Sequence, residues 1–406
     1  MYFELAWRNI WRSPRRTMTI ITAIVIGVWS MVFMGAFSRG MLINMLENGK
    51  SVLIGDIQIH HKNYRADPSI NQSIPHPEKI NSLLKNNLSE GAIFTGRIKV
   101  NAYVSNARHS TGAILVGIDP EKEKKISFIG KSVVRGKYLE PDDKRGILVG
   151  KALLDKFDTI IGKKLILVTR NRQGKVVSKA FKIRGVFKAQ MESTEKSYLF
   201  ITMQGAKNLL GMDNSISEIS IVILKGENID GVINMLKKNL DDKVYSVDSW
   251  ENLLPMLEAY VRIFDEVMYI WYVVVFIAMG FGIVNTSLMA VFERVREFGL
   301  LRALGVKPWQ TISSVLTESM FTLIVGIAAG NFLGYVSVFI MKSSGLNLAI
   351  FSKGAEFFGM SRIIYPVLKL SDVISVNSVI FFLGLVVSLY PAIRAAQITP
   401  VEAMRD

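Results

Sequence analysis

The chain has 406 residues, 50% of them hydrophobic and 20% charged, with a mean hydropathy of +0.30. This balance excludes a disordered chain, a collagen-like fibre and a small disulfide scaffold. The absence of cysteine excludes disulfides, cysteine-ligated zinc, iron–sulfur clusters and a thiol nucleophile. A formal net charge of +15 would suggest a nucleic-acid partner for a soluble protein. Here the apolar residues are concentrated in four long stretches, so we expect an integral membrane protein with no nucleic-acid partner, and we attribute part of the charge to topology and to contact with membrane lipids.

Residues 1–16 predict a cytoplasmic interfacial helix. Phe3, Trp7 and Trp11 recur every four residues while charged side chains occupy the other faces. Pro14 is expected to end this helix.

The four apolar stretches predict four transmembrane helices. The first, Thr17–Phe37, contains no charged residue. A cleaved signal peptide is the alternative for it, but the apolar core of a signal peptide is shorter. Each stretch is long enough to cross about 30 Å of hydrocarbon. The predicted spans are residues 17–39, 267–292, 311–341 and 373–393.

The distribution of basic residues predicts the orientation. Four arginines precede the uncharged stretch Thr17–Phe37 and only Arg39 follows it closely, so the positive-inside rule places the N-terminus in the cytoplasm. Residues 40–266 and 342–372 are then periplasmic, while the 293–310 loop and the 394–406 tail are cytoplasmic. We therefore expect a multi-pass protein of the cell inner membrane with both termini inside.

Residues 40–266 are too long for a loop, and their pattern predicts a large α+β domain. A strand, a short helix and a strand are expected in turn, and the same order returns later, which indicates a split ferredoxin-like porter domain over 40–106 and 206–248. The expected strands are 55–61, 92–105, 217–224 and 243–247, and the expected helices are 77–88 and 230–240.

The intervening residues 107–205 predict an inserted β-rich subdomain. Leu165–Phe187 has the turn chemistry of a hairpin, and further short strands are expected at 147–149 and 198–201.

A stalk helix over 249–266 is expected to follow the porter domain. Asp248 and Glu251 predict a capping box that opens it, and its apolar positions continue into the second span. One rigid helix would then link the outer domain to the membrane.

No motif in the chain predicts catalysis. Gly130-Lys131-Ser132 ends like a phosphate-binding loop, but Lys125 stands where the first glycine of that loop should be. His60 and His61, adjacent at the end of a predicted strand, point to opposite faces, so a shared metal is not expected. We expect no metal, no cofactor and no catalytic residue.

The third span carries one charge, Glu318, a turn or two inside its end. This carboxylate either marks a proton or ion relay or pairs with an arginine of the adjacent loop, and pairing is favoured. Gly326, Gly330 and Gly334 lie along one face of the same helix, which predicts a packing seam within the chain or, on weaker grounds, between two chains.

The most informative segment is ERVREFGLLRALG, residues 293–305. It predicts a short amphipathic helix that Gly305 stops, with Pro308 starting the next helix. Apolar side chains exposed in so short a loop are typical of a docking element, whereas a solvated connector would not need them.

This motif, together with AWRNIWRSPRRT before the first span and YPAIRAAQITPVEAMR closing the fourth, resembles the FtsX-like permeases of mechanotransmitting (type VII) ABC transporters. That family contains MacB and the lipoprotein-releasing LolC and LolE, and the size, span number and outer domain look most like LolC and LolE. The resemblance implies a non-catalytic permease subunit that pairs with a second permease subunit, identical or different, and with a separate LolD-like ATPase.

The resemblance further implies that residues 293–305 form the coupling helix seated on that ATPase. The residues expected to couple are Glu293, Arg294, Arg296, Glu297, Phe298, Leu301, Arg302 and Gly305. The implied function is extraction of lipoproteins from the inner membrane for delivery to a periplasmic carrier. A MacB-like efflux permease for peptides or drugs is the alternative of the same class. A membrane-anchored extracytoplasmic sensor or enzyme is the alternative of another class.

The acyl chains of a lipidated substrate are expected between the first span of one protomer and the second span of its partner. Candidate contacts, chosen by position, are Met31, Met34, Phe37, Met268 and Trp271. The sequence leaves the cargo, the homo- or heteromeric state and the carrier-binding surface open.

Overall fold

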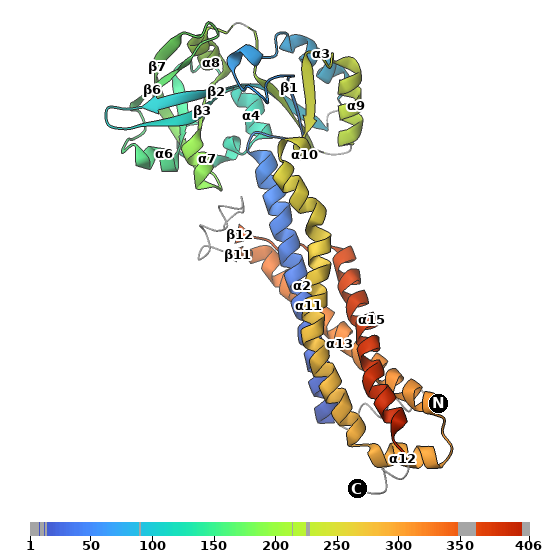
Figure 1. The fold of residues 1–406 in the computed structure, drawn as a ribbon. Coiled ribbons are helices and arrows are strands. Elements are labelled where there is room, and N and C mark those ends of the chain that lie inside the picture. The colour runs from blue at the N-terminus through green and yellow to red at the C-terminus, as the bar shows by residue number, and fades with distance from the viewer. Residues whose placement is uncertain are drawn as a thin grey trace. The chain divides into compact units, whose positions relative to one another are not determined.

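The computed structural model describes residues 8, 12, 14–88, 91–212, 214–224, 228–347 and 363–399. These residues belong to two units (Figure 1). The outer unit comprises residues 44–259, and the membrane unit comprises the described residues on either side of it. The interfacial helix predicted over 1–16 and the end of the tail predicted over 394–406 lie largely outside the described residues.

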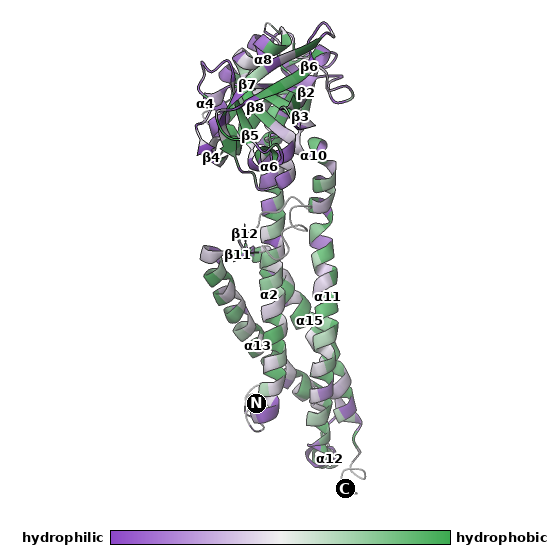
Figure 2. Cartoon of the chain, turned by 90° about the vertical axis from the view of Figure 1, so that its left-hand side faces the viewer, coloured by the Kyte–Doolittle hydropathy of each residue, from purple (hydrophilic) through white to green (hydrophobic). Residues whose placement is uncertain are grey.

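Among the described residues, four helices are long and apolar enough to cross a membrane, which confirms the expected number of spans. Figure 2 shows hydrophobic colouring along most of their length. Three of the four begin at a proline, whose fixed backbone angle suits the first turn of a helix. They are α2 (Pro14–Ser51), α11 (Pro255–Phe292), α13 (Pro308–Ser344) and α15 (Leu370–Gln397).

The three glycines of α13 form a packing seam within the chain. A Cβ atom at Gly330 would lie 2.5 Å from Cβ of Val28 in α2. Cβ atoms at Gly326 and Gly334 would lie 2.5 and 2.8 Å from the side chains of Ile24 and Val32, on the same face of α2. All three glycines are buried. The seam is therefore filled by a helix of the same chain, as expected of small residues that let two backbones approach.

Replacing Gly330 by alanine is expected to destabilise the membrane unit by about 1–3 kcal/mol, because the new methyl group overlaps Val28 and the α2 backbone. Gly282 in α11 is a matched control, since a Cβ there meets no atom within 4 Å. Gly282→Ala should be neutral or slightly stabilising. Thermal unfolding of the two variants in detergent measures the difference, and equal midpoints would contradict the seam.

Polar side chains also fasten the four helices to one another. Arg39 of α2 donates to both carboxylate oxygens of Asp372 in α15, at 2.7 and 3.0 Å, and to Asp265 of α11 at 2.7 Å. The amide nitrogen of Asn331 in α13 donates to the amide oxygen of Asn377 in α15 at 2.9 Å. The helices are thus held by specific hydrogen bonds as well as by close packing.

The outer unit contains the predicted ferredoxin-like arrangement. Four of its strands lie side by side in the order β10–β1–β9–β2, and each neighbouring pair is antiparallel. A strand–helix–strand crossover with a third strand inserted between its two strands is the split βαβ pattern. The elements in chain order are β1 (Ile57–His61), α3 (Pro77–Asn87), β2 (Ala92–Ser105), β9 (Glu218–Ile223), α9 (Ile229–Asn239) and β10 (Tyr245–Ser249).

The insertion between β2 and β9 is rich in strands, and β2 belongs to both parts. Residues 92–97 of β2 pair with β9, while residues 98–105 pair with β3. Because β6 pairs with both β2 and β7, the order β2–β3–β8–β5–β7–β6 closes into a ring of paired strands. The inserted strands are β3 (Ser110–Ile118), β4 (Val133–Gly136), β5 (Gly146–Gly150), β6 (Lys164–Arg170), β7 (Val176–Phe187) and β8 (Tyr198–Thr202).

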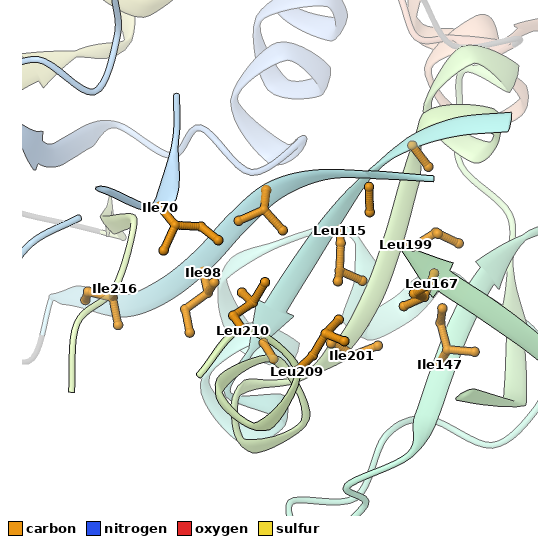
Figure 3. Close-up of a cluster of buried hydrophobic side chains, with 14 of the residues drawn as sticks. Ile70, Ile98, Leu115, Ile147, Leu167, Leu199, Ile201, Leu209, Leu210 and Ile216 are labelled. Atoms are coloured by element: carbon orange, nitrogen blue, oxygen red, sulfur yellow. The ribbon is translucent and has the colours of Figure 1, made fainter. Parts of the chain in front are cut away.

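One hydrophobic core runs through both parts of the outer unit. Figure 3 shows side chains of the strand ring, including Leu115, Ile147 and Leu199, gathered with Leu209 and Leu210 of a short helix. The same cluster includes the buried side chains of β1 and β9. The short helices around the ring are α4 (Pro120–Ile126), α5 (Ile129–Ser132), α6 (Lys151–Lys156), α7 (Glu192–Ser197) and α8 (Met203–Leu210).

A fully buried arginine occupies the point where β2 changes its pairing partner. Arg97 binds Glu123 of α4 through two hydrogen bonds, at 2.8 and 3.0 Å, and Glu218 of β9 at 3.2 Å. It also donates to the carbonyl oxygen of Leu53, just beyond the end of α2. Burial alone would raise the pKa of Glu218, but the nearby Lys99 and Arg97 lower it below its ordinary value, so this carboxylate stays charged.

The expected capping box at the start of the stalk is wrong. Asp248 is part of β10, where it pairs with β1, and Ser249 precedes a single helical turn, α10 (Trp250–Leu253). Leu254 leaves the helical conformation, because the residue before a proline is driven out of the α region, and α11 then starts at Pro255. The predicted stalk is therefore interrupted at Leu254, but from Pro255 onward it continues without a break into the second span, as expected.

Candidate functional site

The loop between α11 and α13 contains the predicted short helix. It is α12, Val295–Ala303, and Gly305 stops it with a φ of +88°, a conformation that favours glycine. Pro308 begins α13. The amphipathic helix predicted over residues 293–305 is thus confirmed as a structural element.

One face of α12 packs against the membrane unit. Phe298, which the resemblance assigns to the coupling set, is only 4% exposed and clusters with Val291, Val315 and two alanines of α15. It therefore supports α12 from the side that packs against the membrane unit. Arg294 stacks over its ring, with 5.3 Å between the guanidinium carbon and the ring centre.

The opposite face of the loop is apolar and exposed. Leu304 is 73% exposed and Leu300 64%, and Leu301 and Trp309 are exposed as well. Of these four, only Leu301 belongs to the predicted coupling set. The signal for the other three was their apolar character in a short charged loop. With the exposed Arg296, they form what we name the docking face: Arg296, Leu300, Leu301, Leu304 and Trp309.

Ion pairs hold the base of α12 in place. Arg294 binds Glu297 at 2.9 Å and Glu318 of α13 at 3.1 Å, so the favoured interpretation of Glu318 as an arginine partner is confirmed. Arg12 binds Glu297 at 2.7 Å, and Arg16 of α2 pairs with Glu293. These contacts tie the 293–310 loop to α2 and α13.

The same contacts keep Glu297 ionised. Its partial burial would raise its pKa, but the hydrogen bond and the charge of Arg294, together with those of Arg12, lower it below the ordinary value. Of the other predicted coupling residues, Arg296 is exposed and Arg302 is partly buried.

The five proposed acyl-chain contacts do not share one environment. Met31 is fully buried in the core of the membrane unit, and Met268 and Trp271 pack against that core. Met34 is exposed and Phe37 is half-buried. Met31 therefore serves packing within the chain.

The described residues contain no group of three or more His, Asp and Glu side chains placed to hold a metal ion. His60 is buried, with its Nε2 atom 2.8 Å from the amide oxygen of Gln58 and its ring stacked on Tyr64. This side chain is part of the packing of the outer unit.

Two family models match the chain in order. The MacB-like periplasmic core domain matches residues 17–239, and the FtsX-like permease C-terminal model matches residues 269–400. With four spans, an α+β outer unit and a short helix on the loop between the second and third spans, the chain belongs to the FtsX-like and MacB-like family of type VII ABC transporter permeases.

Individual relatives are distant. The lipoprotein-releasing system transmembrane protein LolC of Xylella fastidiosa is 25% identical over 76% of each chain, and LolC of Neisseria meningitidis serogroup B is 23% identical over 75% of each. The macrolide export ATP-binding/permease protein MacB of Chlorobium luteolum is 23% identical over this whole chain and 60% of its own length. The crystal structure of the periplasmic region of MacB from Actinobacillus actinomycetemcomitans aligns with 53% of this chain and 97% of its own, at 16% identity and a TM-score of 0.38.

Proposed function

We propose that the docking face binds a separate ABC ATPase and that α12 passes the movement of this ATPase to the membrane helices. The supporting observation is the exposure of Leu300, Leu304 and Trp309 on a loop whose other face is fixed by Phe298 and by the ion pairs of Arg294. An exposed apolar patch on a rigid support is the usual composition of a protein interface. Glu293, Glu297 and Gly305 would then shape and hold the docking element and would not form its contact surface.

The orientation follows from this proposal. An ATPase that uses cellular ATP is cytoplasmic, so the 293–310 loop and both termini would be inside and the outer unit periplasmic. The basic residues of the loop and of the segment before α2 support this orientation through the positive-inside rule. A second permease subunit, identical or different, would complete the transporter.

The proposed cargo is a lipoprotein, extracted from the inner membrane and passed to a periplasmic carrier. The support is the similarity to LolC proteins, which extends over about three quarters of both chains. Efflux of peptides or drugs is the alternative, supported by the alignment of the whole chain with part of MacB. Mass spectrometry of the species that copurify from native membranes separates the two: triacylated lipoproteins support release, and an adaptor with an outer-membrane channel supports efflux.

Replacing Leu304 by aspartate is expected to weaken ATPase binding at least about tenfold, because a charge would be buried in an apolar contact. Ile160, an exposed apolar residue of the outer unit, supplies the control Ile160→Asp, which should leave binding unchanged. Copurification of the ATPase and its stimulated hydrolysis rate measure the effect. If Leu304→Asp retains the ATPase as well as the unchanged chain does, the docking face is wrongly assigned.

A further inference from the structure

A cavity of about 320 Å³ lies among the membrane helices, beside the base of α12. Its charged residues are three arginines and three glutamates: Arg12, Arg16, Arg294, Glu293, Glu297 and Glu318. Its apolar wall includes the buried side chains of Ile24, Ile283 and Leu323. Because α2 begins and α11 ends at this level, the cavity would lie at the depth where lipid headgroups meet the hydrocarbon of a bilayer that these helices span.

Three hydrogen-bonding groups of residues that line this cavity have no partner among the described residues. The Nε atom of Arg16 is buried and has no acceptor in the part of the chain that the structure describes. Thr322 and Ser388 also line the cavity, and they donate to the backbone carbonyls of Glu318 and Gly384 four residues earlier in their own helices, as such residues usually do. The hydroxyl groups of Ser287 and Ser319 also line the cavity and make no hydrogen bond to any described residue. The two hydroxyl groups are therefore available to a polar ligand, and Arg16 keeps one N–H that the described residues do not use.

The charges of the cavity indicate which ligand fits. Three positive and three negative side chains cancel, so a ligand with a large net charge of either sign would meet as many repulsive as attractive groups. A ligand that carries one charge of each sign can use both. A carboxylate that is already paired with an arginine still has free lone pairs to accept a further hydrogen bond.

We propose that this cavity binds the headgroup of a zwitterionic aminophospholipid. The phosphate diester accepts from Arg16, and the primary ammonium group donates to Glu293 or Glu297, which are the more exposed carboxylates of the set. The apolar wall contacts the glycerol backbone and the first methylene groups. The bound lipid lies beside the ion pairs that hold α12, so the position of α12 becomes sensitive to the lipid. Binding itself does not depend on the ATPase proposed above.

Native mass spectrometry of the purified full chain, stripped of lipid and titrated with single phospholipids, tests the proposal. We expect one molecule of palmitoyl-oleoyl phosphatidylethanolamine per chain, bound about tenfold more tightly than phosphatidylcholine, whose quaternary ammonium has no N–H to donate. Phosphatidylglycerol, which lacks the ammonium, should also bind about tenfold more weakly. Free phosphoethanolamine should compete poorly, because it makes no contact with the apolar wall.

Arg16→Gln is expected to lower the affinity for phosphatidylethanolamine about tenfold and to abolish the preference over phosphatidylcholine. The neighbouring Arg15, whose side chain is exposed, supplies the matched control Arg15→Gln, which should bind as the unchanged chain does. Ser319→Ala removes a hydroxyl that the fold does not use and should cost about threefold even if Arg16→Gln folds poorly.

Three outcomes would overturn the proposal. Equal binding of the ethanolamine and choline lipids would remove the role of the ammonium donor. Tighter binding of phosphatidylglycerol would mean that the cavity selects negative charge. Free phosphoethanolamine binding as tightly as the lipid would identify a site for a soluble ligand.

Discussion

Replacing Arg97 by methionine is expected to lower the free energy of unfolding of the outer unit by about 3–5 kcal/mol, because Glu123 and Glu218 would stay buried after losing their shared cation. Both carboxylates are essentially inaccessible to solvent, so water cannot replace the guanidinium without opening the fold. Lys99 is 3.9 Å from Glu218 and can offset only part of that loss.

Two controls separate the loss of charge balance from the loss of packing. The combined variant Arg97→Met, Glu123→Leu and Glu218→Leu removes all three charges and should regain most of the lost stability, since an apolar replacement of a whole buried ion cluster is often neutral. Arg184 pairs with Asp143 at 2.6 Å, but the arginine is half exposed and Asp143 also accepts from the backbone N–H of Arg145, so Arg184→Met should cost less, about 1–2 kcal/mol. Urea titration of the full chain in detergent, followed by hydrogen exchange of β2 and β9 amides, measures all three. If Arg97→Met were as stable as Arg184→Met, the role assigned to Arg97 would be refuted.

Replacing Phe298 by alanine is expected to destabilise the end of the membrane unit that contains α12 by about 3–5 kcal/mol, because a buried aromatic ring is lost from a small cluster. Leu304→Ala, on the exposed side of the same loop, should change stability by no more than about 0.5 kcal/mol. The two variants thus separate the support of α12 from its contact surface.

Thermal unfolding in detergent and ATPase binding, measured on the same preparations, test this contrast. Phe298→Ala should lower the unfolding temperature, and any effect on ATPase binding should follow that loss. Leu304→Ala should weaken binding without lowering the temperature. If Phe298→Ala kept full stability and still lost the ATPase, Phe298 would be a contact residue, as the resemblance implies.

Local patterns in the sequence predicted much of the fold. The strand expected at residues 92–105 is β2 itself, and the hairpin expected over 165–187 is the antiparallel pair β6 and β7. The four spans and α12 were also predictable, because a long apolar stretch and a glycine that ends a helix are both visible in consecutive residues of the sequence. These features depend on interactions between residues that are close in the sequence, and such interactions produce a periodic pattern of apolar and polar residues.

The remaining features depend on contacts between distant parts of the chain. Nothing in the spacing of Arg97, Glu123 and Glu218 predicts that they meet, and the closure of the strand ring depends on the pairing of β6 with β2. The side of α12 that Phe298 occupies was not predictable either, because the amphipathic pattern cannot say which apolar face the rest of the chain covers. Asp248 and Glu251 have the spacing of a capping box, but Asp248 pairs with β1 as part of β10 and so does not cap a helix.

The shared strand β2 limits how the outer unit can be exchanged between relatives. The insertion has no linker where it begins, because β2 is one uninterrupted strand. Its residues 92–97 pair with β9 and its residues 98–105 pair with β3. A chimera that transplants the strand ring must therefore be joined inside the hydrogen-bonded strand β2, next to the buried Arg97. The partners of Arg97 would then come from two different proteins, Glu123 from one and Glu218 from the other. A graft that takes Arg97, Glu123 and Glu218 from one parent protein keeps this cluster neutralised. A graft that takes them from two parents neutralises the cluster only if the residues of the two proteins at these positions carry complementary charges.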